Sequence, residues 1–417
     1  MKKVYFKTFG CRTNQFDTQV MMSKLKNFEL TMSENRADII VVNSCTVTNG
    51  ADSSVRAYIN KANRKYPNTK VILAGCGSHS KGESLFQSQK VFGVMGHSEK
   101  ENINKILQKD KPFYEIGDLN HIDSTIVEQF IGKSRAFIKI QEGCDFDCSY
   151  CIIPSVRGGA RSHNENNVLK QIEKLATNGF GEFILTGTNV GSYGKDTNSS
   201  MAKLLKKISN IRGVRRVRIG SLEPVQIDNE FKELLKEPWM AKHLHIALQH
   251  TSDKMLSIMN RRNRFIEDVK LLEELSSYGY ALGTDYIVGH PGEDELSWQE
   301  AIQRVKELPL THIHAFTYSK RDNTLSATIK DEIIRGDIAK QRHKELTSII
   351  KEKNFQFRKK HNRGLEILIE NGKENIYHGY DQYFNKIEIK SSNELFGNWI
   401  NIDNIEVRGD KNVAIFE

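Results

Sequence analysis

The sequence predicts an α/β protein with three parts: an amino-terminal doubly wound βαβ domain, a central incomplete (βα)6 barrel and a small carboxyl-terminal β-barrel. Three observations support this division. Short apolar runs alternate with helical patterns near the amino end, six further strand–helix units follow, and short strands dominate after residue 362. A chain of 417 residues is long enough for two or three domains. We therefore expect domains at residues 1–120, 130–362 and 363–417.

Each of the first three predicted strands ends at a cysteine. The runs KVYFKTFGC, DIIVVNSC and KVILAGC end at Cys11, Cys45 and Cys76, with helical patterns around residues 17–27 and 51–65 between them. Such Val- and Ile-rich runs indicate buried parallel strands, whose carboxyl ends face one ligand-binding crevice. Three cysteines far apart in the sequence can therefore converge on one metal cluster. The alternative is three unrelated buried thiols.

Three more cysteines lie close together in the run EGCDFDCSYCIIPSVRGGARS. Cys144, Cys148 and Cys151 have the spacing C-x3-C-x2-C, with Tyr150 before the last cysteine. Three thiolates can hold three irons of a cubane cluster and leave the fourth iron open for a small molecule. The alternatives are a structural zinc or free buried thiols. Zinc usually needs a fourth ligand, and His163 is the one local candidate.

The central domain is predicted from six short apolar runs after a linker at residues 117–132. The predicted strands cover 137–141, 183–186, 214–219, 245–249, 286–288 and 313–317, and amphipathic helices cover 165–178, 200–210, 265–278 and 295–307. In βα barrels the active site lies at the carboxyl ends of the strands. The side chains that we expect around this mouth are Thr186, Asn189, Ser221, Glu223, Gln249, Asp285 and Tyr318.

The last part of the chain begins with a long basic helix, predicted over residues 338–361. The runs LEILIE, IYHGYDQY, NKIEIK, NWINIDNIEV and NVAIF then predict short strands joined by turns. Aromatic side chains in this part (Tyr377, Tyr380, Tyr383 and Phe384) can stack on nucleic acid bases. Such aromatics more often fill the core of a small barrel, and we favour that interpretation.

Motifs along nearly the whole chain resemble those of the methylthiotransferase family of radical S-adenosylmethionine (SAM) enzymes. The matching motifs are KTFGCRTNQFD, VVNSCTVTN, AGCGSHS, GCDFDCSYCIIP, RGGARS, LTGTNVGSYG, RIGSLEP, HLHIALQ, MNRR, TDYIVGHPGE and YSKRDNT. VNSCTVTN, RIGSLEP and YSKR favour the branch that modifies threonylcarbamoyl-adenosine in tRNA. The chain departs from the usual LQSGSD and GFPGE with LQHTSD and GHPGE, and Asn323 replaces a usual Gly.

The resemblance implies a radical SAM barrel, a carboxyl-terminal TRAM domain that often binds RNA, and two 4Fe–4S clusters. In the family, an electron from the cluster on Cys144, Cys148 and Cys151 cleaves SAM to methionine and a 5′-deoxyadenosyl radical, which abstracts hydrogen from an unreactive carbon. A second cluster, here on Cys11, Cys45 and Cys76, carries the sulfur of the methylthio group. A second SAM supplies the methyl. The resemblance therefore makes all six cysteines both metal ligands and catalytic residues.

Further cofactor contacts are expected in the barrel loops. The expected set is Tyr150, Thr186, Gly187, Asn189, Ser221, Glu223, Gln249 and Asp285. Gly187 and Gly191 would allow close backbone approach to SAM, although a Gly-rich loop is often only a turn. Glu223 and Asp285, expected at strand ends, can bind a ribose or the SAM amine, or act as a helix cap or surface ion pair.

Positive charge is concentrated in the body of the chain. The net charge is +9, but residues 363–417 carry 6 Lys and Arg against 10 Asp and Glu, so residues 1–362 carry +13. A basic body fits a polyanionic partner such as RNA. Candidate tRNA contacts are Arg212–Arg218, Arg261–Arg264 and Lys351–Lys360, although charge runs are often solvated helix faces. Arg157 and Arg161 can bind a carboxylate or phosphate, or be solvated loop charges.

We therefore expect a tRNA methylthiotransferase that acts at C2 of N6-threonylcarbamoyladenosine at position 37, beside the anticodon. It would recognise the anticodon stem-loop and take electrons from a small protein such as flavodoxin or ferredoxin. One alternative keeps this chemistry on isopentenyladenosine or on a ribosomal-protein aspartate. An alternative from another class is a non-enzymatic zinc-binding RNA protein.

The sequence also favours a cytoplasmic location without membrane association. No apolar run approaches the ~20 residues that span a bilayer. The start runs straight into a predicted strand without a signal-peptide pattern. The six cysteines all belong to the two metal-like groups, which suits a reducing compartment.

Overall fold

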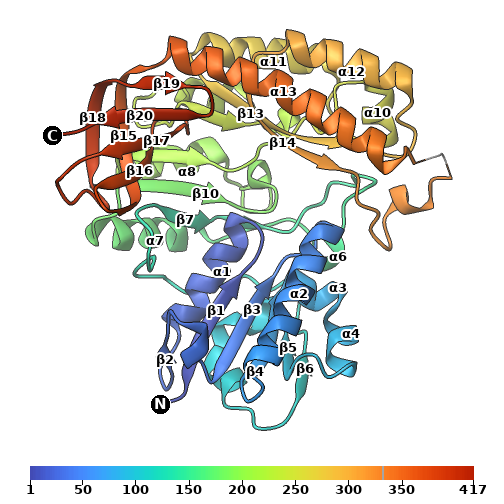
Figure 1. Cartoon of the computed structure of the whole chain (residues 1–417), viewed down its shortest axis with the longest axis vertical. Coiled ribbons are helices and arrows are strands. Elements are labelled where there is room, and N and C mark those ends of the chain that lie inside the picture. Colours follow the sequence, from blue (N-terminus) through green and yellow to red (C-terminus); the bar gives the residue numbers. More distant parts are fainter. Residues whose placement is uncertain (331–332) are drawn as a thin grey trace.

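The computed structural model describes residues 1–330 and 333–417 (Figure 1). In this view the amino-terminal domain lies below the barrel, and the carboxyl-terminal strands pack against one side of it. The long helix α13 ends at Lys360 and the carboxyl-terminal sheet begins at Arg363. Within the described residues, no helix is both long and apolar enough to cross a membrane.

Parallel strands form the amino-terminal sheet in the order β2-β1-β3-β4-β5-β6. The strands are β1 (Lys3–Thr8), β2 (Glu29–Leu30), β3 (Ile39–Ser44), β4 (Lys70–Gly75), β5 (Gly93–Met95) and β6 (Phe113–Glu115). The helices are α1 (Arg12–Ser23), α2 (Asn49–Lys65), α3 (Cys76–Ser80), α4 (Gly82–Gln87) and α5 (Ile103–Leu107). Separate apolar clusters cover the two faces of the sheet, so the predicted doubly wound fold is confirmed.

The strand order reverses between β1 and β3, and ligands bind at such a switch point. Cys11 and Cys45 follow these two strands, and Cys76 follows β4. Helix α1 starts directly after Cys11, earlier than the predicted range of 17–27. Its first turns bury Asn14 and Asp17, polar residues that gave no apolar pattern in the sequence.

The barrel strands follow the order β7-β10-β11-β12-β13-β14, and β7 and β14 form the two open edges. The strands are β7 (Ala136–Lys139), β10 (Glu182–Thr186), β11 (Arg216–Ile219), β12 (His243–His245), β13 (Ala281–Val288) and β14 (Leu310–Thr317). The helices are α6 (Ile153–Arg157), α7 (Glu165–Thr177), α8 (Met201–Ser209), α9 (Asn229–Leu234), α10 (Asp253–Ile258), α11 (Phe265–Ser277), α12 (Glu295–Glu307) and α13 (Gly336–Lys360). Isolated parallel bridges join β11 to the strand that follows it, so the predicted incomplete barrel is confirmed.

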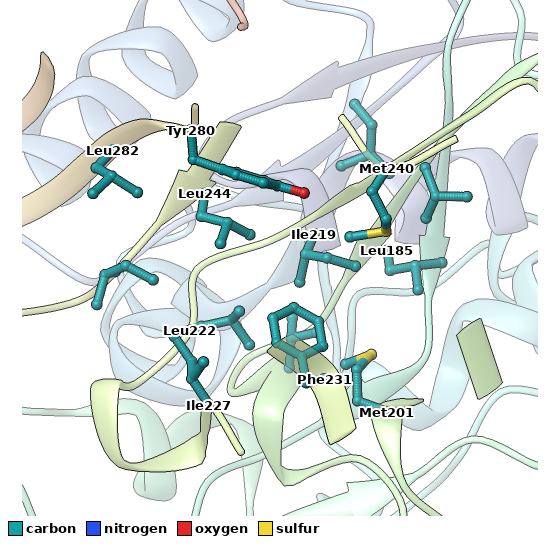
Figure 2. Close-up of a cluster of buried hydrophobic side chains, with 14 of the residues drawn as sticks. Leu185, Met201, Ile219, Leu222, Ile227, Phe231, Met240, Leu244, Tyr280 and Leu282 are labelled. Carbon is teal, nitrogen blue, oxygen red and sulfur yellow. The ribbon is translucent and has the colours of Figure 1, made fainter. Parts of the chain in front are cut away.

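Barrel side chains alternate between two faces. Outward side chains of the strands share one buried apolar cluster with side chains of α8 and α9, and Figure 2 labels Leu185, Ile219, Leu244 and Leu282 of the strands with Met201 of α8 and Phe231 of α9. Each buried side chain of this size contributes about 1.5–3 kcal/mol relative to exposure. The opposite, inner face is polar and carries Glu182, Arg216, Arg218, His243, His245, Asp285 and His314.

The carboxyl-terminal strands form one curled sheet in the order β18-β15-β16-β17-β20-β19, consistent with the predicted small barrel. The strands are β15 (Arg363–Lys373), β16 (Ile376–Tyr380), β17 (Lys386–Lys390), β18 (Trp399–Asn404), β19 (Glu406–Arg408) and β20 (Lys411–Ile415). Tyr377 lies in the Ile- and Leu-rich core and Tyr383 packs on it. Tyr380 and Phe384 instead stack on each other, with ring centroids 4.9 Å apart.

Buried Glu182 anchors the carboxyl-terminal sheet to the barrel. It accepts hydrogen bonds from Arg218 Nε at 2.7 Å and from Arg216 Nη1 at 3.1 Å. Arg216 also donates to the Glu366 carboxylate at 2.8 Å, and Arg218 donates to the backbone oxygen of Gln382 at 3.3 Å. The prediction that these two arginines contact tRNA is therefore wrong, because the domain interface buries them.

Candidate active site

The C-x3-C-x2-C loop leaves the carboxyl end of the first barrel strand. It lies between β8 (Gln141–Glu142) and α6, and the Cys144 N–H closes it by donating to the backbone oxygen of Gly158 at 3.1 Å. Inside the loop, the Cys151 N–H donates to the backbone oxygen of Cys148 at 3.0 Å. All three cysteines are half-buried.

Side chains from two other barrel loops reach these sulfurs. Asn189 Nδ2 lies 3.6 Å from Cys144 Sγ, and Arg261 Nη1 lies 3.4 Å from Cys148 Sγ. Glu223 holds this arginine, with its Oε1 2.9 Å from Arg261 Nη1. Two residues predicted from the sequence therefore lie at the cysteine loop. Asn189 contacts a cysteine directly, and Glu223 contacts the arginine that reaches Cys148. The prediction of Arg261 as a tRNA contact is wrong, because the side chain is buried here.

The loop is also held by a residue at which the chain departs from the family pattern. Ser149 Oγ accepts a hydrogen bond from Ser326 Oγ at 2.8 Å, and Ser326 Oγ lies 2.7 Å from His290 Nε2. The His290 ring also packs edge-on against Tyr150, with centroids 6.3 Å apart, and against Tyr318 at 5.1 Å. The departure GHPGE therefore supports the cysteine loop.

The other three cysteines meet at the switch point of the amino-terminal sheet. Burial raises the pKa of Cys76 to about 11, and the nearby thiols of Cys11 and Cys45 act in the same direction. Gly10 packs so closely on Cys45 that an added Cβ would lie 2.7 Å from the Cys45 Cβ. Cys11 is exposed, Cys45 half-buried and Cys76 buried, so this trio opens to solvent on one side.

Arg157 connects the two trios. It ends α6, directly after the cysteine loop, and is 2% exposed. Its Nε–H donates to Cys76 Sγ at 3.2 Å, its Nη1 lies 3.1 Å from Asp17 Oδ2, and it also bonds to Glu142 and Asn14. Helix α3 packs against α6 at this point (Figure 1). The alternative that Arg157 is a solvated loop charge is wrong.

A buried ion network around this arginine was missed by the sequence reasoning. Lys139 Nζ lies 2.6 Å from Asp17 Oδ1 and 3.1 Å from Glu142 Oε2, and it also contacts Asp123. Lys100 bonds to Asp17 and Asp123 at 2.9 Å each. The available signal was a lysine inside an otherwise apolar strand, since buried lysines are almost always paired.

The thiols of the described residues are not arranged as three ligands of a single zinc ion. Ligand atoms about 2.3 Å from one tetrahedral zinc lie within about 4 Å of one another. Among the described residues, no group of three candidate ligand atoms within 4.8 Å of one another includes a cysteine. In a cubane each cysteine binds a different iron, which needs wider spacing. His163, the candidate fourth zinc ligand, lies instead with Asp123 and Glu142.

The remaining predicted residues differ in their surroundings. Thr186 ends β10 and is buried, and Gln249, with φ +66°, pairs with β13 through its backbone. Ser221 is exposed. An added Cβ at Gly187 would lie 2.9 Å from the Oε1 of Gln141, so close packing inside the protein explains that glycine.

Two more predictions receive a structural explanation. An added Cβ at Gly191 would lie 2.2 Å from the Oε1 of Gln226, again because of packing inside the protein. Arg161 is buried and donates to the backbone oxygens of Arg157 at 2.8 Å and Gly159 at 2.9 Å. It is therefore not a solvated charge.

Asp285 does not lie at a strand end as predicted. Strand β13 extends from Ala281 to Val288, and Asp285 lies in its middle, where the glycine at 283 hid the strand in the sequence. Its Oδ1 is 3.1 Å from His245 Nε2 and 3.3 Å from His314 Nδ1. Burial acts to raise the pKa of Asp285, but the two imidazoles outweigh burial and hold it below its usual range. This carboxylate faces the barrel interior.

A groove of about 580 Å³ lies between the two domains. Its walls are the start of α2, which follows Cys45 closely, the end of β14, and Lys340 and His343 on α13. Tyr318 lines the groove and contacts His290, which packs on Tyr150 of the cysteine loop. One residue of the groove wall therefore contacts a side chain that packs on this loop.

The chain matches two family descriptions, "Uncharacterized protein family UPF0004" over residues 3–96 and "Radical SAM superfamily" over residues 138–305. It is 52% identical to a Helicobacter pylori (strain J99) protein named "Putative methylthiotransferase", with 100% of both chains covered. It is 33% identical to "Threonylcarbamoyladenosine tRNA methylthiotransferase MtaB" of Aquifex aeolicus, covering 88% of this chain and 92% of the relative. The chain belongs to the radical SAM methylthiotransferase family.

One further relative agrees with this membership, and one solved structure shares the fold. The MtaB protein of Bacillus subtilis is 31% identical over 96% of this methylthiotransferase and 93% of the relative. The structure of the radical SAM methyltransferase TsrM from Kitasatospora setae, with cobalamin and a 4Fe–4S cluster bound, has a TM-score of 0.58 at 14% identity, covering 76% of this chain and 75% of that one. The second likeness concerns the fold alone. Radical SAM membership implies one 4Fe–4S cluster and SAM as cofactors.

Proposed function

We propose that this methylthiotransferase acts on tRNA and inserts a methylthio group at C2 of N6-threonylcarbamoyladenosine at position 37. The observation that carries the proposal is the meeting of two cysteine trios from different domains, linked by the 3.2 Å contact of Arg157 with Cys76. Such an arrangement suits one centre for activation and one for sulfur delivery. The names of the Aquifex aeolicus and Bacillus subtilis relatives support the choice of nucleoside.

Both metal sites are part of the proposal. Cys144, Cys148 and Cys151 would hold the cluster that binds SAM, and Cys11, Cys45 and Cys76 would hold the second cluster. When bound, these groups and SAM supply the radical, the sulfur and the methyl of the reaction. The chain's own residues orient the first site, because Asn189 and Arg261 direct N–H groups at its sulfurs.

The groove between the domains is the proposed entry for the anticodon stem-loop. Lys320 and Lys340 line it, and both are exposed. Replacing both with Ala should reduce the log–log salt slope of stem-loop binding by about 1.4, since each phosphate contact on a single strand contributes about 0.7. The matched control replaces Lys105 and Lys111, exposed lysines outside the groove, and should leave the slope unchanged. Equal slopes in all three proteins would exclude the groove as the entry.

Nucleoside mass spectrometry of tRNA from a deletion strain tests the function directly. The methylthio form of threonylcarbamoyladenosine should vanish, its precursor should accumulate, and the wild-type gene should restore it. The second candidate is isopentenyladenosine, because a Fervidobacterium nodosum relative named "tRNA-2-methylthio-N(6)-dimethylallyladenosine synthase" is 30% identical over 95% of this chain. Loss of that methylthio nucleoside instead would select it. The reaction as proposed belongs in the cytoplasm and needs a small reducing protein such as flavodoxin or ferredoxin.

A further inference from the structure

The inner face of the barrel holds several arginines, and almost all of them have a carboxylate partner. Arg218 Nε lies 2.7 Å from Glu182 and Arg216 Nη2 lies 2.8 Å from Glu366. Arg135 bonds to the Glu370 carboxylate. These pairs neutralise the guanidinium groups that burial would otherwise destabilise.

Arg12 is the exception. It directly follows Cys11 and extends from the amino-terminal domain toward this face, with its Cζ 5.4 Å from the centre of the Phe384 ring. Arg218 and Arg135 approach the same ring, at 5.2 and 5.5 Å. Within residues 1–330 and 333–417, no carboxylate oxygen lies within 4.0 Å of the Arg12 guanidinium.

The environment of Arg12 leaves its positive charge under-compensated. Arg135 and Arg218 lie around the same Phe384 ring as Arg12, whereas the carboxylate of Glu182 bonds to Arg216 and Arg218. Burial and nearby cations hold the pKa of His243, beside Phe384, well below its usual range, so this imidazole is neutral. Arg12 therefore adds a positive charge that no described carboxylate pairs with.

An anionic ligand group would offset this charge. A planar guanidinium donates two parallel hydrogen bonds to a carboxylate, a geometry that a lysine ammonium cannot reproduce. Arg12 is only partly buried. His245 and His314 lie on the same inner face and are occupied by Asp285. Among the described residues, Arg12 is thus an arginine near this face that has no carboxylate partner.

We propose that Arg12 binds the carboxylate of the substrate's N6 substituent inside the barrel and thereby selects a carboxylate-bearing adenosine over an apolar one. This inference rests on the proposed function, because it assumes that the modified base enters the barrel. An RNA phosphate offers the same anionic chemistry, and the experiment below separates the two sources.

The test compares three anticodon stem-loops that differ only at position 37. They carry threonylcarbamoyladenosine, its carboxyl methyl ester, or isopentenyladenosine. Binding is measured by fluorescence anisotropy, and KM and kcat for methylthio formation are measured with reconstituted enzyme. The variants are Arg12→Gln, Arg12→Lys and, as a control, Arg56→Gln, which removes the same charge from an exposed position of α2.

Arg12→Gln should weaken binding of the carboxylate stem-loop about 10- to 100-fold, as for loss of a charge-assisted hydrogen bond. It should leave binding of the ester stem-loop unchanged. Wild-type enzyme should bind the ester about as weakly as Arg12→Gln binds the acid. Arg12→Lys should recover part of the loss, and Arg56→Gln should keep the full difference between acid and ester.

Two results would overturn the inference. If Arg12→Gln weakens acid and ester equally, Arg12 contacts a phosphate or acts structurally. If neither is weakened, Arg12 does not contact the RNA. Failure of the proposed function looks different, because wild-type enzyme would then form no methylthio product on the carboxylate stem-loop. Cleavage of SAM without methylthio product would show that the Arg12→Gln variant is folded and holds its cofactors.

Discussion

The two cysteine trios are assembled by opposite routes. Cys144, Cys148 and Cys151 lie within one short loop, and backbone hydrogen bonds inside that loop set their geometry. Cys11, Cys45 and Cys76 follow three separate strands, so the sheet has to form before they meet. The local trio is therefore encoded by spacing and the distant trio by topology. Arg157 is where the two routes join, because it follows the local loop and donates to Cys76.

The comparison predicts separable roles. Cys148→Ala should abolish both SAM cleavage and methylthio product, because the local trio would bind the cluster that activates SAM. Cys45→Ala should abolish the product and leave part of the SAM cleavage. Both activities are followed by chromatography of 5′-deoxyadenosine and of modified nucleoside. Loss of 5′-deoxyadenosine in a folded Cys45→Ala variant would contradict the division of roles.

Iron content sharpens the same comparison. Anaerobically reconstituted protein should hold about eight irons per chain, from two cubanes. Replacing Cys144, Cys148 and Cys151 with Ala should leave about four, and the matched replacement of Cys11, Cys45 and Cys76 should leave the other four. Zinc in place of iron, or loss of all iron in one folded triple variant, would show that the sites are not two independent clusters.

The link between the trios should matter for stability. Arg157→Gln leaves buried Asp17 and Glu142 with less counter-charge, and breaking such a buried pair costs about 3–5 kcal/mol in the free energy of unfolding. Urea unfolding of the metal-free protein measures this loss. Arg161→Gln is the control, because its closest bonds go to backbone oxygens. An equal effect in both variants would mean that the inter-domain ion pairs add nothing specific.

Substitution of one glycine beside each cysteine trio tests whether the two trios hold their metal independently. Gly10 (φ +94°) lies beside the distant trio and Gly143 (φ +74°) beside the local one. Alanine at either position adopts a left-handed conformation at a cost of about 1–2 kcal/mol. It also brings a Cβ to 2.7 Å from the Cys45 Cβ or to 1.8 Å from the Gly159 oxygen. Gly10→Ala should reduce iron retention only in the distant trio, and Gly143→Ala only in the local trio. Iron analysis in the two triple-cysteine backgrounds checks this.

Apolar periodicity was enough to predict the architecture, but it did not predict which charged residues are buried or how they pair. Runs rich in Val and Ile predicted the strands before each amino-terminal cysteine, and strand–helix alternation predicted the open barrel. Charge runs were misleading, because Arg216 and Arg218 look like a basic surface but are buried against Glu182. Their partner lies 34 and 36 residues earlier, and no local pattern connects the two.

The sequence by itself determined the cysteine spacing, the order of strands and helices and the membership in this family, because these depend on local periodicity and short motifs. The tertiary structure alone decided which charges are paired. Arg157 meets Cys76 and Asp17 only after two domains dock. Within the described residues, Arg12 has no carboxylate partner, and the nearby Glu182 bonds to Arg216 and Arg218. Pairing of buried charges depends on distances across the folded chain, and residue order does not encode those distances.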